Sequence, residues 1–354
     1  MSNQIPSKPR FHYAEEKARQ VLLYCNVSTM PIDVRSLIKS SNKCTIKRYS
    51  KLMERYSFSK QDLVDNFGND GAILYDTQNT KTYTIIYNDI DKPDTRINWT
   101  LAHELGHFVL KHHIDFDETK LIRGGLTDYE YKVLDAEADA FAAELLSPLM
   151  VMIAANWDTK DALIQHTGLS NMAARNRSRA IRRVKIFKEC YFKYERELYY
   201  TFYNHIYKKF CPECKTSFVD RDAKYCPICG AHNLIWKNTE ENIMKYEGVN
   251  VNELSKAIVC PVCQNEEILE NGDYCAICGT YLVNHCSDIT DEYDNIEKQG
   301  CGTLLPGNAR YCPYCGNPSH FKQINALCSW EQEQAIFKSL ESGKSVPFDE
   351  EIPF

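Results

Sequence analysis

The sequence lacks any long hydrophobic run. Its first twenty residues, MSNQIPSKPRFHYAEEKARQ, contain no apolar core of a secretory signal, and no later stretch approaches the roughly 20 apolar residues that a membrane-spanning helix requires. We therefore expect a cytoplasmic protein in a reducing compartment. There, the 16 cysteines favour metal sites over disulfides, because CxxC pairs in cytosolic proteins bind metal more often than they form disulfides.

Positive charge is scarce in the C-terminal part of the chain. Residues 211–354 carry 11 Lys and Arg against 22 Asp and Glu, a net charge of −11, whereas residues 1–210 carry 31 against 26, a net charge of +5. This split predicts two regions with different surfaces. With 354 residues, 44% of them hydrophobic, the chain is long enough for two or three domains.

One apolar segment, TLAHELGHFVLKHH at residues 100–113, contains the motif HExxH. In a helix, His103 and His107 lie one turn apart on the same face, so both imidazoles can bind one zinc ion. Glu104 then stands beside the attacking water molecule, where it can act as the general base of a metallopeptidase. A chance match with two core histidines is the alternative interpretation.

The surroundings of the motif predict a buried helix. Apolar residues at helical spacing form one stripe: Ala102, Leu105 and Val109. Gly106 is unfavourable inside a helix, so we expect it to admit the close approach of another backbone. His112 and His113 are interpreted as a solvated helix end.

A metallopeptidase zinc ion needs a third protein ligand, which leaves the fourth position for water. The place to look is a second apolar segment, LDAEADAFAAELLSP at residues 134–148. Asp135 and Asp139 are one helical turn apart and share a face, so one can bind the metal while the other orients a ligand histidine. Glu137 points roughly 200° away from Asp135 around the helix and cannot serve the same site without distortion.

Two β-like runs precede the HExxH segment. ILYD and TYTIIYN, at residues 73–76 and 82–88, are separated by a turn predicted at residues 76–80. If the strand just before the zinc helix has a free edge, an extended peptide substrate can add to it as a further strand. An ordinary internal strand is the alternative. Farther upstream, PIDVRSLIKS at residues 31–40 predicts a short helix.

Residues 14–148 resemble the ImmA/IrrE family of metallo-endopeptidases. The resemblance runs through PIDV, YTIIYN, Arg96 ahead of TLAHELGHFVLKH, and EADAFAAELLSP. It implies an α+β fold with a zincin-like catalytic domain. Members of this family act as cytosolic proteases on transcriptional repressors, so the resemblance implies a substrate of that class.

The resemblance also implies roles for individual residues. His103 and His107 bind zinc, Glu104 is the general base, and the third ligand is an acidic residue at the position occupied here by Asp135. The family usually has glutamate at this position, and the shorter aspartate must bring its helix closer to the metal. Glu137 therefore remains the alternative third ligand.

The segment DTKDALIQHTGLSNMAARNRSRAIRRVKIFK, at residues 158–188, resembles a helix-turn-helix. It places Gly168 between two short helical patterns and is rich in arginine and lysine. In the ImmA/IrrE family a similar helical segment follows the catalytic domain. We therefore favour a structural or substrate-docking role, with DNA reading as the alternative.

Cysteine pairs organise the C-terminal half. Two repeats contain CxxC pairs separated by 11 residues, and each predicts a four-cysteine zinc ribbon. Their cysteines are Cys211, Cys214, Cys226 and Cys229 in the first ribbon, and Cys260, Cys263, Cys275 and Cys278 in the second. A third ribbon is predicted from Cys286, Cys301, Cys312 and Cys315, with His285 as the alternative to Cys286. The repeat is also visible in KYCPICG, DYCAICG and RYCPYCG.

Four thiolates close the coordination shell of zinc, so the ribbons are expected to be structural sites. Zinc holds together small domains whose cores are slight. Ribbons bind either nucleic acid or protein. Because a net charge of −11 disfavours attraction to phosphate, we expect protein contacts.

These observations predict an order of domains. A zincin-like metallopeptidase domain at residues 1–150 is followed by a basic helical segment at 151–210, ribbons at 211–236, 255–284 and 285–320, and a tail at 321–354. We expect one catalytic and three structural zinc ions. The predicted function is site-specific cleavage of a regulatory protein such as a transcriptional repressor. The alternative is a DNA-binding or protein-binding regulator with a non-catalytic peptidase fold.

The chain ends in SVPFDEEIPF, in which Asp349, Glu350 and Glu351 precede the terminal Phe354. This end resembles the acidic tip of bacterial single-stranded-DNA-binding proteins, which recruits repair and replication enzymes. Such a tip can place a phenylalanine ring in an apolar pocket while its carboxylate meets a basic residue. The resemblance therefore implies docking on receptors of that tip, and a solubilising acidic tail is the alternative.

Overall fold

The computed structural model describes residues 5–76, 82–115, 127–187, 194–237 and 243–341. The chain forms two compact units, Met1–Ile206 and Tyr207–Phe354. No helix within the described ranges is long and apolar enough to cross a membrane. The turn predicted at residues 76–80 lies outside these ranges apart from Asp76, and the predicted C-terminal tip lies outside them entirely.

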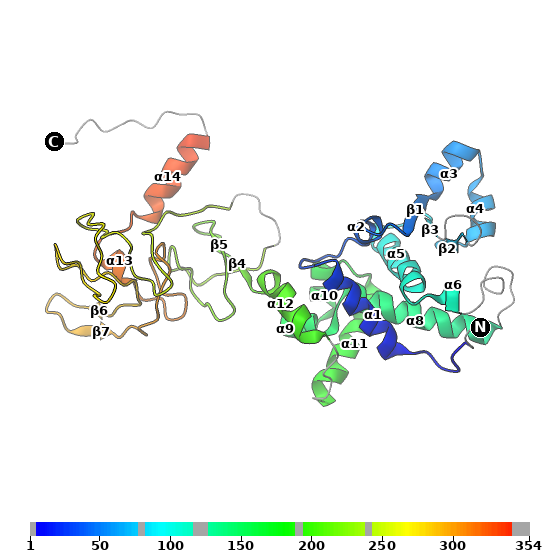
Figure 1. Ribbon diagram of the computed structural model, residues 1–354, viewed down its shortest axis with the longest axis horizontal. Helices are drawn as coiled ribbons and strands as arrows, with labels where there is room; N and C mark the ends of the chain where they lie inside the picture. The colour runs from blue at the N-terminus through cyan, green and yellow to red at the C-terminus, as the bar shows by residue number, and fades with distance from the viewer. Residues whose placement is uncertain (1–4, 77–81, 116–126, 188–193, 238–242, 342–354) are drawn as a thin grey trace. The chain divides into compact units, whose positions relative to one another are not determined.

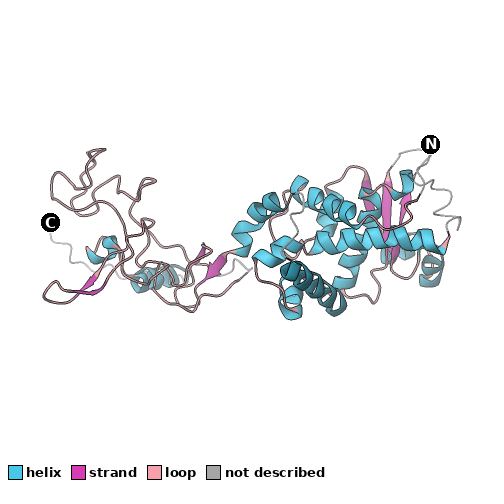
Figure 2. Ribbon diagram, turned by 90° about the horizontal axis from the view of Figure 1, so that it is seen from below, coloured by secondary structure: helices cyan, strands magenta, loops and turns pink. Residues whose placement is uncertain are grey.

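The first unit is mostly helical and has one small sheet at one side, as Figures 1 and 2 show. Its elements, in chain order, are α1 (Phe11–Tyr24), α2 (Val34–Lys39), β1 (Cys44–Arg48), α3 (Tyr49–Tyr56), α4 (Lys60–Phe67), β2 (Gly71–Tyr75), β3 (Tyr83–Tyr87), α5 (Asp94–Val109), α6 (His112–Asp115), α8 (Asp128–Leu146), α9 (Leu149–Ala154), α10 (Lys160–Thr167), α11 (Asn171–Phe187) and α12 (Glu195–Ile206). The α+β class expected from the sequence is confirmed.

The sheet has the strand order β1-β3-β2. β1 is parallel to β3, and β2 is antiparallel to it, so that Ile85 at the centre of β3 lies opposite Ile46 on one side and Ile73 on the other. Of the two alternatives for the strand just before the zinc helix, the internal strand is confirmed, because β3 is hydrogen-bonded on both sides. The edge strands are β1 and β2.

Helix α5, which contains the HExxH motif, packs against α8 and against strands β2 and β3. A Cβ atom added to Gly106 would lie 3.2 Å from the Cα atom of Ala138 and 3.1 Å from the Phe141 ring. Such spacing is tighter than ordinary van der Waals contact, so a Cβ atom at this position would push the facing helix away by a few tenths of an ångström. The expectation that Gly106 admits another backbone is confirmed.

The helix-turn-helix-like segment is fixed to the rest of the first unit. α10 ends at Gly168, whose φ of +68° is strained for any residue with a side chain. Arg177 of α11 donates hydrogen bonds to the carboxylate of Glu144 and to the carbonyl oxygen of Ser147. Arg19 of α1 donates to the other oxygen of Glu144 at 2.8 Å. Because these side chains are buried, α1, α8 and α11 are joined by one buried ionic cluster.

The second unit is mostly loops with little regular structure. Its elements are β4 (Lys208–Phe210), β5 (Ser217–Val219), β6 (Ile289–Thr290), β7 (Ile296–Lys298), α13 (His320–Gln323) and α14 (Trp330–Glu341). Its buried apolar residues form small clusters, and each cluster contains at least two cysteines of one four-cysteine group. These cysteines are part of the small cores, whereas Cys263, Cys278 and Cys301 are exposed.

Candidate metal centres

The first candidate centre joins the HExxH helix α5 to helix α8. The Nε2 atoms of His103 and His107 lie 3.2 Å apart, and the nearest Asp135 carboxylate oxygen is 4.0 Å from the first and 3.6 Å from the second. Ligand atoms in a tetrahedral zinc site with bonds of about 2.0–2.1 Å lie roughly 3.3 Å apart. The three side chains therefore fit zinc, and the Asp135 side chain, 57% exposed, leaves the site open to solvent.

Asp139 supports His103 from the next turn of α8. Its carboxylate lies 2.9 Å from the Nδ1 atom of His103. If Nδ1 carries the proton and donates to Asp139, the lone pair of Nε2 is available for the metal. Burial disfavours the charged imidazolium, but the hydrogen bond to Asp139 and the nearby carboxylates raise the pKa of His103 overall. This places Asp139 in the orienting position expected from its spacing to Asp135.

A second chain of hydrogen bonds lies behind His107. The Nδ1 atom of His107 is 2.9 Å from Nδ1 of His112, and Nε2 of His112 is 3.2 Å from the carboxylate of Glu137. Arg10 completes the chain, because its side chain and its backbone N–H donate three hydrogen bonds to Glu137, each 2.8 Å long. Protons on Nδ1 of His107 and Nε2 of His112 would again leave Nε2 of His107 free for the metal.

The interpretation of His112 and His113 as a solvated helix end is wrong. His112 is 0% exposed and His113 is also buried. α6 follows α5 after only two residues and contacts it, so that its histidines face the interior. Burial lowers the pKa of His107, and the neighbouring histidines lower it further, which keeps the imidazole in the neutral form that binds metal.

Glu137, the alternative third ligand, lies apart from the metal group. Its fully buried carboxylate is held by Arg10 and His112. Burial alone would raise its pKa, but the hydrogen bonds from Arg10 and His112 lower it to about 2. The helical geometry explains this placement, since Glu137 points away from the face that carries Asp135 and Asp139.

Sequence reasoning missed the supporting role of Arg10 and His112. Arg10 precedes α1 and lies 127 positions before Glu137, so no local pattern connects the two. For His112 a weak signal existed, because a histidine five residues beyond the HExxH motif lies within reach of the same helix end. Buried polar groups of this kind need partners, and only the tertiary fold shows which partners they have.

Glu104 lies beside the metal group and is 91% buried. Burial raises the pKa of Glu104 to about 7, and the charge of Asp135 adds to this effect, while His103 and the backbone N–H of Ile73 lower the pKa. Ile73 belongs to β2. The edge strand β2, which packs against α5, therefore brings a backbone N–H next to the carboxylate that the motif assigns as general base.

A cavity of about 450 Å³ opens beside Glu104 and His103. It is lined by Arg96 and Trp99 of α5, by Asp139 of α8 and by residues 167–170, 172 and 173 of the helix-turn-helix-like segment. Arg96 is paired with Asp70, which precedes β2. The helix-turn-helix-like segment therefore forms one wall of the cleft that leads to the candidate metal centre.

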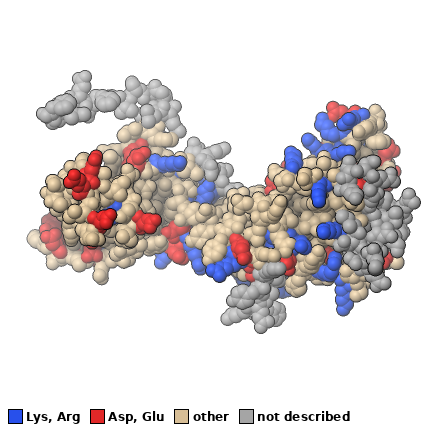
Figure 3. Space-filling model, in the orientation of Figure 1, with Lys and Arg blue, Asp and Glu red and all other residues tan. Residues whose placement is uncertain are grey.

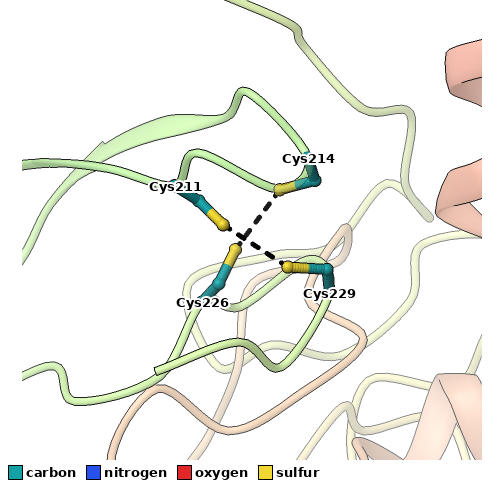
Figure 4. A group of neighbouring side chains, drawn as sticks. All are labelled: Cys211, Cys214, Cys226 and Cys229. Carbon is teal, nitrogen blue, oxygen red and sulfur yellow. Dashed lines mark hydrogen bonds between the residues drawn. The ribbon is translucent and has the colours of Figure 1, made fainter. Parts of the chain in front are cut away.

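The three other candidate centres are the four-cysteine groups of the second unit. In the first ribbon, the sulfur atoms of Cys211 and Cys229 are 3.4 Å apart and those of Cys214 and Cys226 are 3.5 Å apart, and all four converge on one point (Figure 4). Zinc–sulfur bonds of about 2.3 Å place sulfur atoms about 3.8 Å apart in a tetrahedron, so the group fits zinc.

The second and third ribbons have the same arrangement. Sulfur distances are 3.6 Å for Cys260 and Cys278, 3.5 Å for Cys263 and Cys275, 3.3 Å for Cys286 and Cys315, and 3.5 Å for Cys301 and Cys312. His285 is not part of the third group. Its Nδ1 atom lies 3.1 Å from the carbonyl oxygen of Val283, and its ring stacks on that of His320. The structure thus brings Cys286, and not His285, to this centre.

Comparison with known proteins agrees with this description of the first unit. Residues 65–179 match the model of a peptidase family described as the IrrE N-terminal-like domain (Peptidase_M78). The matched range begins in α4, contains all residues of the first metal centre, and continues through α10 into α11. No curated protein matches the chain.

Proposed function

Because residues 65–179 match the IrrE N-terminal-like peptidase family, we propose that this protein is a zinc-dependent endopeptidase that cleaves a regulatory protein at a specific site. The observation that carries the proposal is the convergence of His103, His107 and Asp135 beside Glu104 at the end of an open cleft. A transcriptional repressor in the cytoplasm is the substrate class that fits this family.

In the proposed reaction, His103, His107 and Asp135 would hold zinc. When bound, the ion would polarise the scissile carbonyl group and lower the pKa of a water molecule. Glu104 accepts the proton from the attacking water and passes it to the leaving amine. Its burial suits this role, because a carboxyl group with a pKa near 7 can both accept and release a proton near neutral pH.

The substrate is proposed to bind along the outer edge of β2. Asp70 and Asp76 take part in the ladder with β3, through hydrogen bonds of 2.9 Å to Asn88 and Thr82. In an antiparallel pair, every second residue of a strand is hydrogen-bonded to its partner strand, and the residues between point their backbone groups away from it. Because Asp70 and Asp76 are bonded to β3, Ile73 is one of the residues between, and its backbone N–H and C=O point to the free edge of β2. A peptide added there as a strand would lie beside Glu104, whose carboxylate the backbone N–H of Ile73 faces.

The ribbons and the C-terminal tip are proposed to bind proteins. The net charge of −11 over residues 211–354 disfavours nucleic acid as the main partner of the ribbons. The tip, with Phe354, is proposed to dock on receptors of the single-stranded-DNA-binding protein tail. Deleting Phe354 should abolish such docking and leave peptidase activity unchanged. A tail peptide that fails to compete with the genuine tip at low salt would contradict the docking.

A DNA-binding regulator with an inactive peptidase fold is the competing function. Arg175, Arg179 and Arg183 are exposed on α11 at spacings of four residues, so they share one face of the helix. Such a face can meet phosphate groups. The buried links from Arg177 to Glu144 and Ser147 and the place of this segment in the cleft wall favour a role in the peptidase instead.

The test compares cells that express the wild-type protein with cells that express Glu104→Gln. Quantitative proteomics should find at least one protein that loses its full-length form only with the wild type, and whose fragments share one cleavage site. Glu104→Gln preserves size and hydrogen-bonding capacity, so the variant should still bind the same protein. If both forms change transcript levels equally and no protein is cleaved, the regulator function is correct.

A further inference from the structure

The first and third ribbons are paired with each other inside the second unit. Each contains a knuckle, defined here as the tyrosine-containing CxxC turn: residues 224–230 in the first ribbon and 310–316 in the third. The backbone N–H groups of residues 224 and 225 donate to the carbonyl oxygen of Pro313, at 2.7 and 2.9 Å. In return, those of residues 310 and 311 donate to Pro227, at 2.7 and 3.0 Å. The contact is reciprocal.

The tyrosine rings complete this pairing. A Cβ atom added to Gly230 would lie 3.1 Å from the ring of Tyr311, and one added to Gly316 would lie 3.0 Å from the ring of Tyr225. Each knuckle therefore offers two N–H donors, one carbonyl acceptor, one tyrosine ring and one glycine that receives the ring of its partner. A surface that carries both halves of a contact is self-complementary and pairs through a twofold axis.

The second ribbon carries the same set of groups at residues 273–279, DYCAICG. Among the described residues, no group accepts from the N–H of Asp273 or Tyr274, and none donates to the carbonyl oxygen of Ala276. A Cβ atom on Gly279 would meet no described atom within 4 Å. The second knuckle thus has the donors, the acceptor and the open glycine, and the part of the chain that the structure describes supplies no partner.

The exposure of the side chains agrees with this difference. Tyr274 is 62% exposed, whereas Tyr225 and Tyr311, the tyrosines of the two paired knuckles, are only partly exposed. Ile277 of the second knuckle is 74% exposed. Val262, in the facing CxxC turn of the second ribbon, is also exposed. Exposed apolar residues grouped around unpaired backbone groups mark an interaction surface.

We propose that the second ribbon pairs with the second ribbon of another copy of this chain. The N–H groups of Asp273 and Tyr274 donate to Ala276 of the other copy, and each Tyr274 ring covers the Gly279 of the other copy. The pairing repeats between chains the contact that the first and third ribbons make within one chain. A second copy is the occupant because one knuckle contains both halves of the contact, so two identical knuckles leave no group unpaired.

The direct test is analytical ultracentrifugation of the zinc-loaded full-length chain from about 1 to about 200 μM, a range that brackets the affinity of a small, partly polar interface. We expect a monomer–dimer equilibrium. Tyr274→Ala and Ile277→Asp should each raise the dimer dissociation constant roughly tenfold or more. Tyr293→Ala is the matched control, because Tyr293 is 82% exposed and lies outside all three knuckles; it should change nothing. Zinc content verifies that the ribbons of each variant remain folded.

Hydrogen exchange locates the contact. In peptides that cover residues 270–282, the amides of residues 273 and 274 should exchange more slowly at high than at low protein concentration, and Tyr274→Ala should remove the difference. A chain that stays monomeric at the highest concentration overturns the proposal. A dimer that resists both substitutions and gives no protection at residues 273–279 also overturns it, since the copies then meet elsewhere.

Discussion

The two units of this protein place their candidate zinc ligands in opposite relations to the hydrophobic core. In the first unit, His103, His107 and Asp135 lie on two helices that are already packed through fully buried residues such as Leu101 and Phe141. In the second unit, by contrast, cysteines of each group are themselves members of the small buried clusters. A metal ion is thus expected to serve chemistry in the first unit and folding in the second.

The largest effect that follows from this comparison is selective unfolding on metal removal. A strong chelator should unfold the second unit, because its clusters lose the ions that hold them together, and should leave the first unit folded. Hydrogen exchange measures both units in one sample. Amides of residues 207–341 should lose protection while those of α5 and α8 keep it. Simultaneous loss of protection in both units would refute the distinction.

The next largest effect concerns catalysis. Glu104→Gln should lower the rate of substrate cleavage by about 10²- to 10⁴-fold, because it removes the proton acceptor and keeps the shape of the side chain. Zinc content and thermal stability should not fall. The same substitution at the exposed Glu197 of α12 is the control and should leave the rate unchanged. Undiminished cleavage by Glu104→Gln contradicts the mechanism.

A smaller effect separates the two acidic residues of α8. Asp135→Ala should abolish zinc binding at the first centre, because it removes a ligand. Glu137→Gln should weaken zinc binding only about 10- to 100-fold, since Glu137 acts on His107 through His112. Competition with a zinc-binding dye measures both affinities. The opposite ranking would make Glu137 the ligand.

The packing of α5 on α8 predicts a change of about 1–3 kcal/mol in the free energy of unfolding when Gly106 is replaced. Gly106→Ala should lower the free energy of unfolding by this amount, because the new methyl group meets Ala138 and Phe141 at 3.1–3.3 Å. Gly272→Ala in the second unit is the matched control, since its Cβ atom would meet no described atom closer than 3.6 Å. Denaturant unfolding of both variants checks the contrast. Equal stability of Gly106→Ala and wild type would argue against the close packing of α5 on α8.

The smallest expected effect is that of replacing His285 on zinc binding by the third ribbon. His285→Ala should leave zinc bound there, because the His285 ring stacks on His320 and lies outside the cysteine group. Cys286→Ala should release the ion. The zinc content of each variant is measured and compared with that of the wild type. Loss of zinc in His285→Ala alone would show that the ribbon uses histidine.

The parts of the structure that the sequence predicted best depend on local geometry. The i to i+4 spacing of His103 and His107, and that of Asp135 and Asp139, puts each pair on one helical face wherever the helix lies. The CxxC spacing in the ribbons is local in the same way. Such patterns survive any tertiary arrangement, so they could be recognised from residues alone.

The parts that could not be predicted depend on contacts between distant segments. The parallel pairing of β1 with β3, which makes β2 the free edge beside Glu104, joins strands separated by three other elements. The support of His107 by Arg10 through Glu137 and His112 joins residues that lie up to 127 positions apart. A buried polar residue and a solvated one look alike in sequence, as His112 illustrates, because burial is set by the whole fold.

The pairing of the ribbons is an intermediate case. The repeat of KYCPICG, DYCAICG and RYCPYCG was visible in the sequence, but it did not show that two of the three knuckles pair with each other. Partner choice depends on the path of the chain between the repeats. That path brings residues 224–230 against residues 310–316 and leaves residues 273, 274 and 276–279 exposed.

The zinc content of purified protein tests the central distinction between the two units most directly. We predict four zinc ions per wild-type chain, and three in a variant in which His103 and His107 are both replaced by alanine. The variant should lose peptidase activity, while its second unit keeps its protection from hydrogen exchange. A fully active wild-type protein with two zinc ions or fewer, or a double variant that still binds four, would contradict the account.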